Sequence, residues 1–155
     1  MDTPPSGRLK GSVHLFPVRV YYEDTDAGGI VYHPAWLRFA ERARSELFRC
    51  LGIPPRKILE ETGVSFVVRH CEIDFRAPAR LDDSLVVMTQ LESLSGATIV
   101  FRQDIGRTED TILAQMKVRL AALSATGRPV RIPAAARQEM EGLARAVPGT
   151  GGKLP

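Results

Sequence analysis

The chain has few cysteines and no long apolar run. It has two cysteines in 155 residues, Cys50 and Cys71, and they lack the Cys-x-x-Cys spacing of a metal or redox site. Both fall in apolar surroundings, so we expect buried thiols. No segment approaches the roughly 20 apolar residues that a membrane helix needs, and no secretory signal stands at the start. We therefore expect a cytoplasmic protein without a transmembrane segment.

Excess charge is also lacking. Lys and Arg number 21 against 18 Asp and Glu, for a net charge of +3, and the basic residues are spread along the chain. Without a dense basic run or interleaved aromatic residues, nucleic acid is not an expected partner. A diffuse positive surface is compatible with a small anionic ligand instead.

The order of apolar patterns predicts one α+β domain over residues 14–132. A strand at 18–22 precedes an amphipathic helix at 34–51, which Gly52 and two prolines end. A second short helix covers 56–61. Residues from 64 onward change to a period of two, which predicts four mostly antiparallel strands. We expect a flexible tail at 1–13, and a short helix with a disordered tail at 133–155.

The most informative stretch joins the first predicted strand to the long helix. It contains Asp26, two consecutive glycines and then Pro34, which is well placed to begin a helix. A carboxylate would thus lie beside the positive end of a helix, where backbone N–H groups favour negative charge. The spacing predicts a catalytic turn, whereas Asp24 fits the role of a turn residue.

Residues 22–44 resemble the 4-hydroxybenzoyl-CoA thioesterase group of hotdog-fold enzymes, and most closely the Tol-Pal-associated acyl-CoA thioesterases. The resemblance is carried by Tyr-Glu-Asp-Thr-Asp-Ala-Gly-Gly-Ile-Val-Tyr-His at 22–33 and Glu-Arg-Ala-Arg at 41–44. It implies a five-stranded antiparallel sheet wrapped around one long helix. It also implies a homodimer or homotetramer with the site between subunits, and hydrolysis of acyl-CoA thioesters without a metal or cofactor. An acyl carrier protein is a further candidate partner.

The resemblance assigns Asp26 as the catalytic carboxylate, acting as nucleophile or general base, and the backbone N–H of His33 as the group that holds the thioester carbonyl. The alternative for Asp26 is a turn residue that bonds its own backbone. The His33 imidazole is a candidate for proton transfer, because histidine side chains titrate near neutral pH; the alternative is a polar side chain at a helix start.

Four further residues complete the predicted site. Gly29, Tyr32 and Trp36 are candidates for substrate binding, although aromatic rings here also suit a core. Glu41 is a candidate to anchor the catalytic loop, or alternatively to pair with Arg42 or Arg44 on a solvated helix face, which contributes only a few tenths of a kcal/mol.

Two other functions compete with thioester hydrolysis. A non-catalytic module that binds acyl-CoA or an acyl carrier protein would keep the pocket, but it has no need for Asp26. A hotdog dehydratase pairs a histidine with a carboxylate in sequence surroundings that this chain lacks. The hairpin at 93–95, where some relatives grip the CoA phosphates with basic residues, is uncharged here. Candidate substitutes for that cluster are Arg69, Arg76, Arg80 and Arg102.

Overall fold

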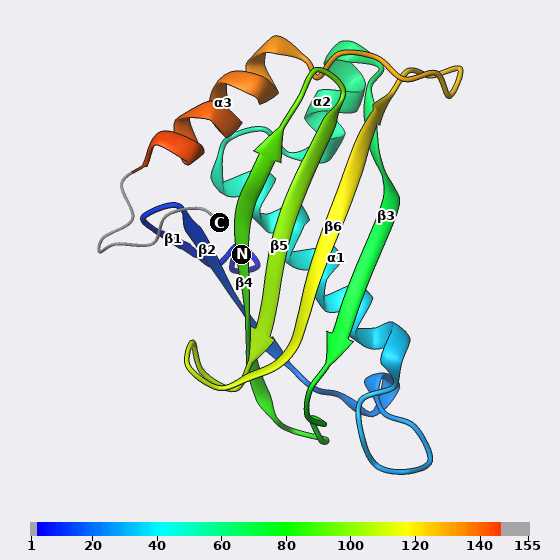
Figure 1. Cartoon of the computed structure of the whole chain (residues 1–155), viewed down its shortest axis with the longest axis vertical. Coiled ribbons are helices and arrows are strands. Elements are labelled where there is room, and N and C mark those ends of the chain that lie inside the picture. The colour runs from blue at the N-terminus through cyan, green and yellow to red at the C-terminus, as the bar shows by residue number, and fades with distance from the viewer. Residues whose placement is uncertain (1–2, 147–155) are drawn as a thin grey trace.

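The computed structural model describes residues 3–146 and places an antiparallel sheet around one long helix, α1 (Figure 1). The six strands lie in the order β1-β2-β4-β5-β6-β3, and every neighbouring pair is antiparallel. The strands are β1 (Arg8–Lys10), β2 (Val13–Arg19), β3 (Ser65–Phe75), β4 (Ser84–Leu94), β5 (Thr98–Gly106) and β6 (Ile112–Leu123). The helices are α1 (His33–Cys50), α2 (Pro55–Thr62) and α3 (Ala134–Arg145), with a 3-10 turn at Tyr22–Asp24.

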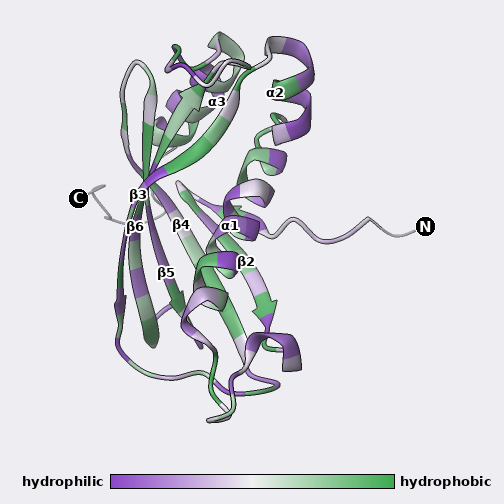
Figure 2. Ribbon diagram, turned by 90° about the vertical axis from the view of Figure 1, so that its right-hand side faces the viewer, coloured by the Kyte–Doolittle hydropathy of each residue, from purple (hydrophilic) through white to green (hydrophobic). Residues whose placement is uncertain are grey.

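The sheet curves so that its inner face covers α1, and α2 continues along the same side (Figure 2). The buried side of α1 carries apolar residues at three- and four-residue steps, as an amphipathic helix requires. That side packs over β2 and β4, and α3 closes one end of the sheet against β4. The resulting core is continuous, and its largest fully buried side chains include Phe39, Leu47, Phe101, Ile105 and Met116.

The predicted fold is confirmed, with one strand added. Residues 8–10, placed in a flexible tail by the sequence, form β1 and pair with β2. The first strand of the core spans Val13–Arg19 rather than 18–22, because Tyr22–Asp24 turns into a 3-10 helix. The predicted disorder after residue 147 lies outside the described residues. No helix in the described part of the chain is long and apolar enough to cross a membrane.

The prediction that both cysteines are buried is wrong. Cys50 is exposed, because it is the last residue of α1 and lies off the buried side formed by Leu47 and Phe48. Cys71 is half-buried on β3, which is an edge strand and has one unpaired side among the described residues. Burial still raises the pKa of both thiols.

A buried polar network ties α1 to the sheet. Arg44 is only 7% exposed, and its Nη1 donates to Oε1 of Gln103 at 2.8 Å. The Gln103 amide nitrogen in turn donates to the Ala40 carbonyl and to Thr89 Oγ1, both at 2.9 Å. Burial lowers the pKa of Arg44, and the nearby Glu41 carboxylate opposes that shift. Each polar atom of the Gln103 side chain therefore has a partner, as a buried amide requires.

We expect Gln103→Ala to lower the free energy of unfolding by about 3 kcal/mol, because it leaves the buried Arg44 guanidinium without its acceptor and Thr89 Oγ1 without its donor. Thr89→Val removes one acceptor and keeps the side-chain shape, so a smaller loss of about 1 kcal/mol is expected. Urea unfolding of both variants measures the difference. Equal stability of Gln103→Ala and the parent would show that the network contributes nothing.

Candidate active site

The catalytic turn, defined here as residues 24–33, leaves the 3-10 helix and returns to the start of α1. The Asp26 N–H donates to the Ile30 carbonyl at 2.9 Å, and the Gly29 N–H donates to the Asp26 carbonyl at 3.0 Å. One step further out, the Tyr32 N–H donates to the Asp24 carbonyl at 2.8 Å. The turn is thus a narrow loop closed by its own backbone. It fixes the position of Asp26 relative to the helix.

The two aspartates of the turn have different environments. The Asp24 side chain is buried, and its Oδ2 accepts the Tyr21 N–H at 2.8 Å, as its predicted turn role requires. Asp26 is exposed, and its Oδ1 accepts the Gly28 N–H at 2.8 Å. Asp26 Oδ2 makes no hydrogen bond to any residue in the range 3–146. One carboxylate oxygen of Asp26 is therefore held by the turn while the other faces solvent.

The start of α1 presents an unpaired backbone donor at the end of the same turn. His33 is the first helical residue, and its N–H makes no hydrogen bond within the described chain. Pro34 follows and has no N–H, and no side chain caps this end. Free N–H groups and the helix dipole both favour negative charge here. The turn therefore combines an acceptor that can act as a base with a donor suited to an oxyanion.

The His33 ring is exposed and lies between two other aromatic rings. Its centroid is 4.8 Å from that of Tyr32 and 6.5 Å from that of Phe75, both in edge-on arrangements. Phe75 is the last residue of β3 and is about half exposed. Sequence reasoning did not predict that Phe75 lies beside His33. An aromatic residue at the end of a strand, just before Arg76-Ala77-Pro78, was the signal available.

The remaining predicted site residues separate into two groups. Gly29 and Tyr32 belong to the turn. Gly29 has φ +78°, and no atom lies within 4 Å of the place where a Cβ would stand. The backbone angle, and not crowding, is therefore what requires glycine at this position. Trp36 is 3% exposed and packs edge-on against Phe39, so it is a core residue rather than a pocket wall. Glu41 makes no hydrogen bond to the turn among the described residues, and lies two helical turns away beside Arg44.

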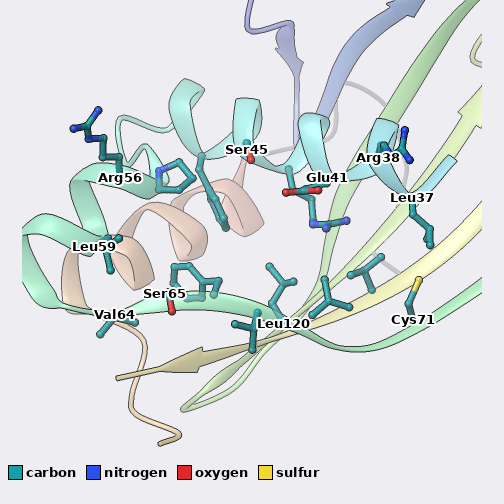
Figure 3. A pocket seen from close by; sticks show the side chains of 17 residues that line it. Leu37, Arg38, Glu41, Ser45, Arg56, Leu59, Val64, Ser65, Cys71 and Leu120 are labelled. Carbon is teal, nitrogen blue, oxygen red and sulfur yellow. The ribbon is translucent and has the colours of Figure 1, made fainter. Parts of the chain in front are cut away.

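A cleft of about 770 Å³ begins one helical turn beyond His33 (Figure 3). It lies between α1, α2 and β3, and Glu41, Arg44 and Cys71 are on its walls. Most of the lining is apolar. Those apolar side chains are Leu37, Phe48, Pro55, Leu59, Val64, Phe66, Val67, Val68, Val118 and Leu120.

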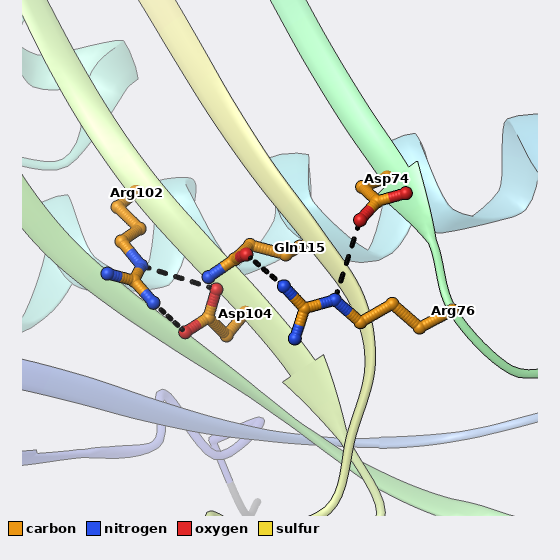
Figure 4. Close-up of polar contacts among 5 residues, drawn as sticks. All are labelled: Asp74, Arg76, Arg102, Asp104 and Gln115. Atoms are coloured by element: carbon orange, nitrogen blue, oxygen red, sulfur yellow. Dashed lines mark hydrogen bonds and ion pairs between the residues drawn. The ribbon is translucent and has the colours of Figure 1, made fainter.

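The arginines proposed to bind the CoA phosphates differ in whether their side chains already have partners in the protein. On the sheet face away from α1, Arg102 pairs with Asp104 at 3.2 Å, while Arg76 donates to Gln115 at 2.7 Å and lies 3.5 Å from Asp74 (Figure 4). Both guanidinium groups are thus already engaged by side chains of the same face. Arg80 instead forms a β-bridge with Ile30, directly beside the catalytic turn.

Comparison with known proteins identifies relatives of this chain. Residues 20–140 match the family described as the thioesterase-like superfamily. The chain is 45% identical over 119 residues to an acyl-CoA thioesterase, YbgC, of Haemophilus influenzae, covering 76% of this chain and 87% of that one. It is 47% identical over 110 residues to the acyl-CoA thioester hydrolase YbgC of Escherichia coli, covering 71% and 81%.

A solved structure gives the same result. The crystal structure of a probable thioesterase from Bartonella henselae superposes with a TM-score of 0.73 at 38% identity, covering 78% of this chain and 99% of that one. The match of the family model spans the catalytic turn, all of α1 and strands β3 to β6. The resemblance predicted from residues 22–44 is confirmed: this chain belongs to the thioesterase-like superfamily.

Proposed function

We propose that this chain hydrolyses the thioester of an acyl-coenzyme A to the free acid and CoA, with Asp26 as nucleophile or general base and the His33 N–H polarising the carbonyl. One observation carries the proposal: the Asp26 carboxylate and the unpaired His33 N–H belong to one turn at the positive end of α1. The names of the relatives with 45% and 47% identity support the same reaction and substrate class.

Hydrolysis through this turn proceeds by one of two balanced routes. In the first, Asp26 takes a proton from water and the hydroxide attacks the carbonyl carbon. In the second, a carboxylate oxygen attacks directly, and water then hydrolyses the acyl–aspartate anhydride. Both routes place negative charge on the carbonyl oxygen, where the His33 N–H stabilises it, before the carbon–sulfur bond breaks. The CoA thiolate leaves and takes a proton from solvent or from the His33 imidazole. Losing one oxyanion donor typically lowers the rate by ~10²–10³.

Thiol release from a panel of acyl-CoA thioesters tests this function. We expect turnover with at least one acyl group, read as free CoA in a thiol-reactive dye assay. Tight binding of acyl-CoA without release of thiol would instead identify a non-catalytic binding module. Acyl groups carried on an acyl carrier protein present the same thioester, so the panel includes them as a second substrate form.

We further propose that the active protein is a homodimer or homotetramer. β3 has only one sheet neighbour in the described chain, so its outer backbone groups are free to pair with a second copy. Exposed apolar side chains gather near this edge, and an assembly would cover them. They are Tyr32, Leu37, Val67, Val68 and Phe75. A cytoplasmic location stays a prediction.

We expect Arg69→Pro to weaken self-association by at least roughly tenfold, the effect of about one lost hydrogen bond to a neighbouring strand. Arg69 has no partner residue on β6, because the register of the β3–β6 pairing shifts between Val68 and His70. A proline at this position, which lacks an N–H, is therefore expected to leave the pairing of β3 with β6 intact. Arg69→Ala is the matched control. Sedimentation equilibrium measures the association constant, and a parent protein that is monomeric and active would contradict the assembly.

A further inference from the structure

The catalytic turn is attached to a second loop at the same end of the sheet, the lower end in Figure 1. This supporting loop, defined here as residues 76–83, joins β3 to β4. Within the described residues, one hydrogen bond links the turn to a segment distant in sequence: the Val31 N–H donates to the Ala79 carbonyl at 2.8 Å. Ile30 and Arg80 form a β-bridge beside that bond. The position of the turn therefore depends on the position of the supporting loop.

Asp83 closes the supporting loop. Its Oδ2 accepts the Arg80 N–H at 2.8 Å, and its own N–H donates to the Arg80 carbonyl at 3.1 Å. The Asp83 carbonyl accepts the Val20 N–H at 3.0 Å, which ties the loop to the segment that leads into the catalytic turn. The bond from the Arg80 N–H and the nearby Arg107 guanidinium lower the pKa of Asp83, so its carboxylate is charged at neutral pH.

Arg107 reaches the same carboxylate from the connection between β5 and β6. Its Nη1 donates to Asp83 Oδ2 at 2.5 Å, and its Nη2 donates to the Pro78 carbonyl at 3.3 Å. One planar guanidinium thus bonds to both sides of the supporting loop, which a lysine ammonium does less well. The backbone of Arg107 is itself held, because its N–H donates to the Thr111 carbonyl at 3.0 Å. A Cβ at Gly106 would lie 2.3 Å from that carbonyl oxygen, so glycine permits this tight connection.

We propose that Arg107 and Asp83 are positioning residues for thioester hydrolysis, which hold the catalytic turn in place through the supporting loop. The inference rests on the proposed function and adds two residues that act through the turn. Their side chains are 43% and 22% exposed, and a pair this close to solvent contributes little to stability. A misplacement of about 1 Å in a reacting group such as Asp26 can lower the rate by roughly 10²-fold. Loss of the pair is therefore expected to affect the rate more than the stability.

The first test removes the guanidinium and keeps a long side chain. We expect Arg107→Met to lower kcat by at least roughly tenfold and to leave KM within roughly twofold, because orientation is lost and binding is not. Lys117→Met is the matched control: Lys117 pairs with Glu92 at 2.9 Å, their side chains are 49% and 21% exposed, and the pair lies away from the supporting loop. We expect this variant to keep the parent kcat within roughly twofold. An unchanged kcat in Arg107→Met would overturn the proposal.

Two substitutions of Asp83 separate loss of the charge from loss of the loop contact. Asparagine can still accept the Arg80 N–H with its side-chain oxygen, whereas alanine cannot. We expect Asp83→Asn to retain a kcat at least roughly threefold higher than that of Asp83→Ala, the effect of about one hydrogen bond. Equal kcat values would mean that Asp83 acts through its charge and not by closing the loop, contrary to the proposal. Arg107→Met changes an exposed side chain, so the first test still decides if Asp83→Ala fails to fold.

The last test needs no turnover. Native-state hydrogen exchange, followed by NMR, reports how often the Val31 N–H separates from the Ala79 carbonyl. We expect Arg107→Met to speed exchange at Val31 by at least roughly tenfold, the scale of a lost hydrogen bond to a charged group, and Lys117→Met to keep the parent rate. An unchanged exchange rate at Val31 in Arg107→Met would overturn the positioning role, even in an active enzyme. Faster exchange in a chain whose parent releases no thiol would remove the proposed function, and would leave Arg107 as a structural support of the turn.

Discussion

Asp26→Asn is expected to lower kcat for acyl-CoA hydrolysis by at least roughly 10²-fold, the scale of a lost catalytic base. The substitution separates the two roles of this residue. Asp26 Oδ1 accepts the Gly28 N–H, and the Asn carbonyl oxygen can accept the same bond, so the turn keeps its shape. Only the charge and basicity of the side chain are lost. A turn residue would therefore tolerate Asn, whereas a nucleophile or base would not.

Glu23→Gln is the matched control for this substitution. Glu23 is an exposed carboxylate three residues earlier in the same segment, and neutralising it changes the net charge by the same amount. We expect its kcat to stay within roughly twofold of the parent, because surface substitutions have small effects. Steady-state thiol release with a single acyl-CoA measures both variants. Equal rates for Asp26→Asn and the parent would remove Asp26 from the mechanism.

Gly29→Val is expected to lower kcat by roughly 10²-fold, because a misplacement of about 1 Å in a reacting group has an effect of this size. Gly29 has φ +78°, and a β-branched residue is strained at that angle. The Gly29 N–H bonds to the Asp26 carbonyl, so relief of the strain moves the carboxylate that we propose to be catalytic. Gly29→Asn should retain most activity, since asparagine tolerates this conformation.

Gly52→Val is the matched control, because it introduces the same backbone strain at a position outside the catalytic turn. Gly52 follows α1, has φ +75°, and like Gly29 has no atom within 4 Å of a substituent at Cα. Both valine variants are expected to lose stability by a similar amount, about 1–2 kcal/mol. Thermal unfolding measures that loss, and thiol release at a temperature where both are folded measures activity. Equal kcat values for the two valine variants would show that the turn does not position Asp26.

The parts of the fold that depend on local pattern were predictable from the sequence. Apolar spacing and Gly52 set the end of α1 to within one residue, and the period-two pattern located β3 to β6. β2 was misplaced because two adjacent tyrosines suggested a strand, whereas the backbone turns at Tyr22 with Asp24 holding the Tyr21 N–H. β1 is three residues long, too short for a periodic signal.

In the predicted site, too, the features that depend on local sequence were predictable and those that depend on long-range packing were not. Asp26, Gly29 and the start of α1 are contiguous in the chain, so the turn that joins them could be predicted from one segment. The sequence did not show whether Trp36 lies in the core or in a substrate pocket. The burial of residues 35 and 36 depends on which side of α1 packs on the sheet, and this is known only from the fold. The Arg44–Gln103 bond joins residues 59 apart, and the cleft combines residues from Leu37 to Leu120. Such contacts depend on packing that a single sequence does not contain.

The account depends on a reacting carbonyl being held by the His33 N–H in the turn that carries Asp26. The most direct test is the amide ¹H–¹⁵N chemical shift of His33 in the Asp26→Asn protein, measured before and after saturation with an acyl-CoA that this variant turns over slowly. We predict a downfield shift of the His33 amide proton as it donates to the thioester oxygen, together with changes at Gly28 and Gly29. A His33 amide that does not move while other residues report binding would contradict the proposed site.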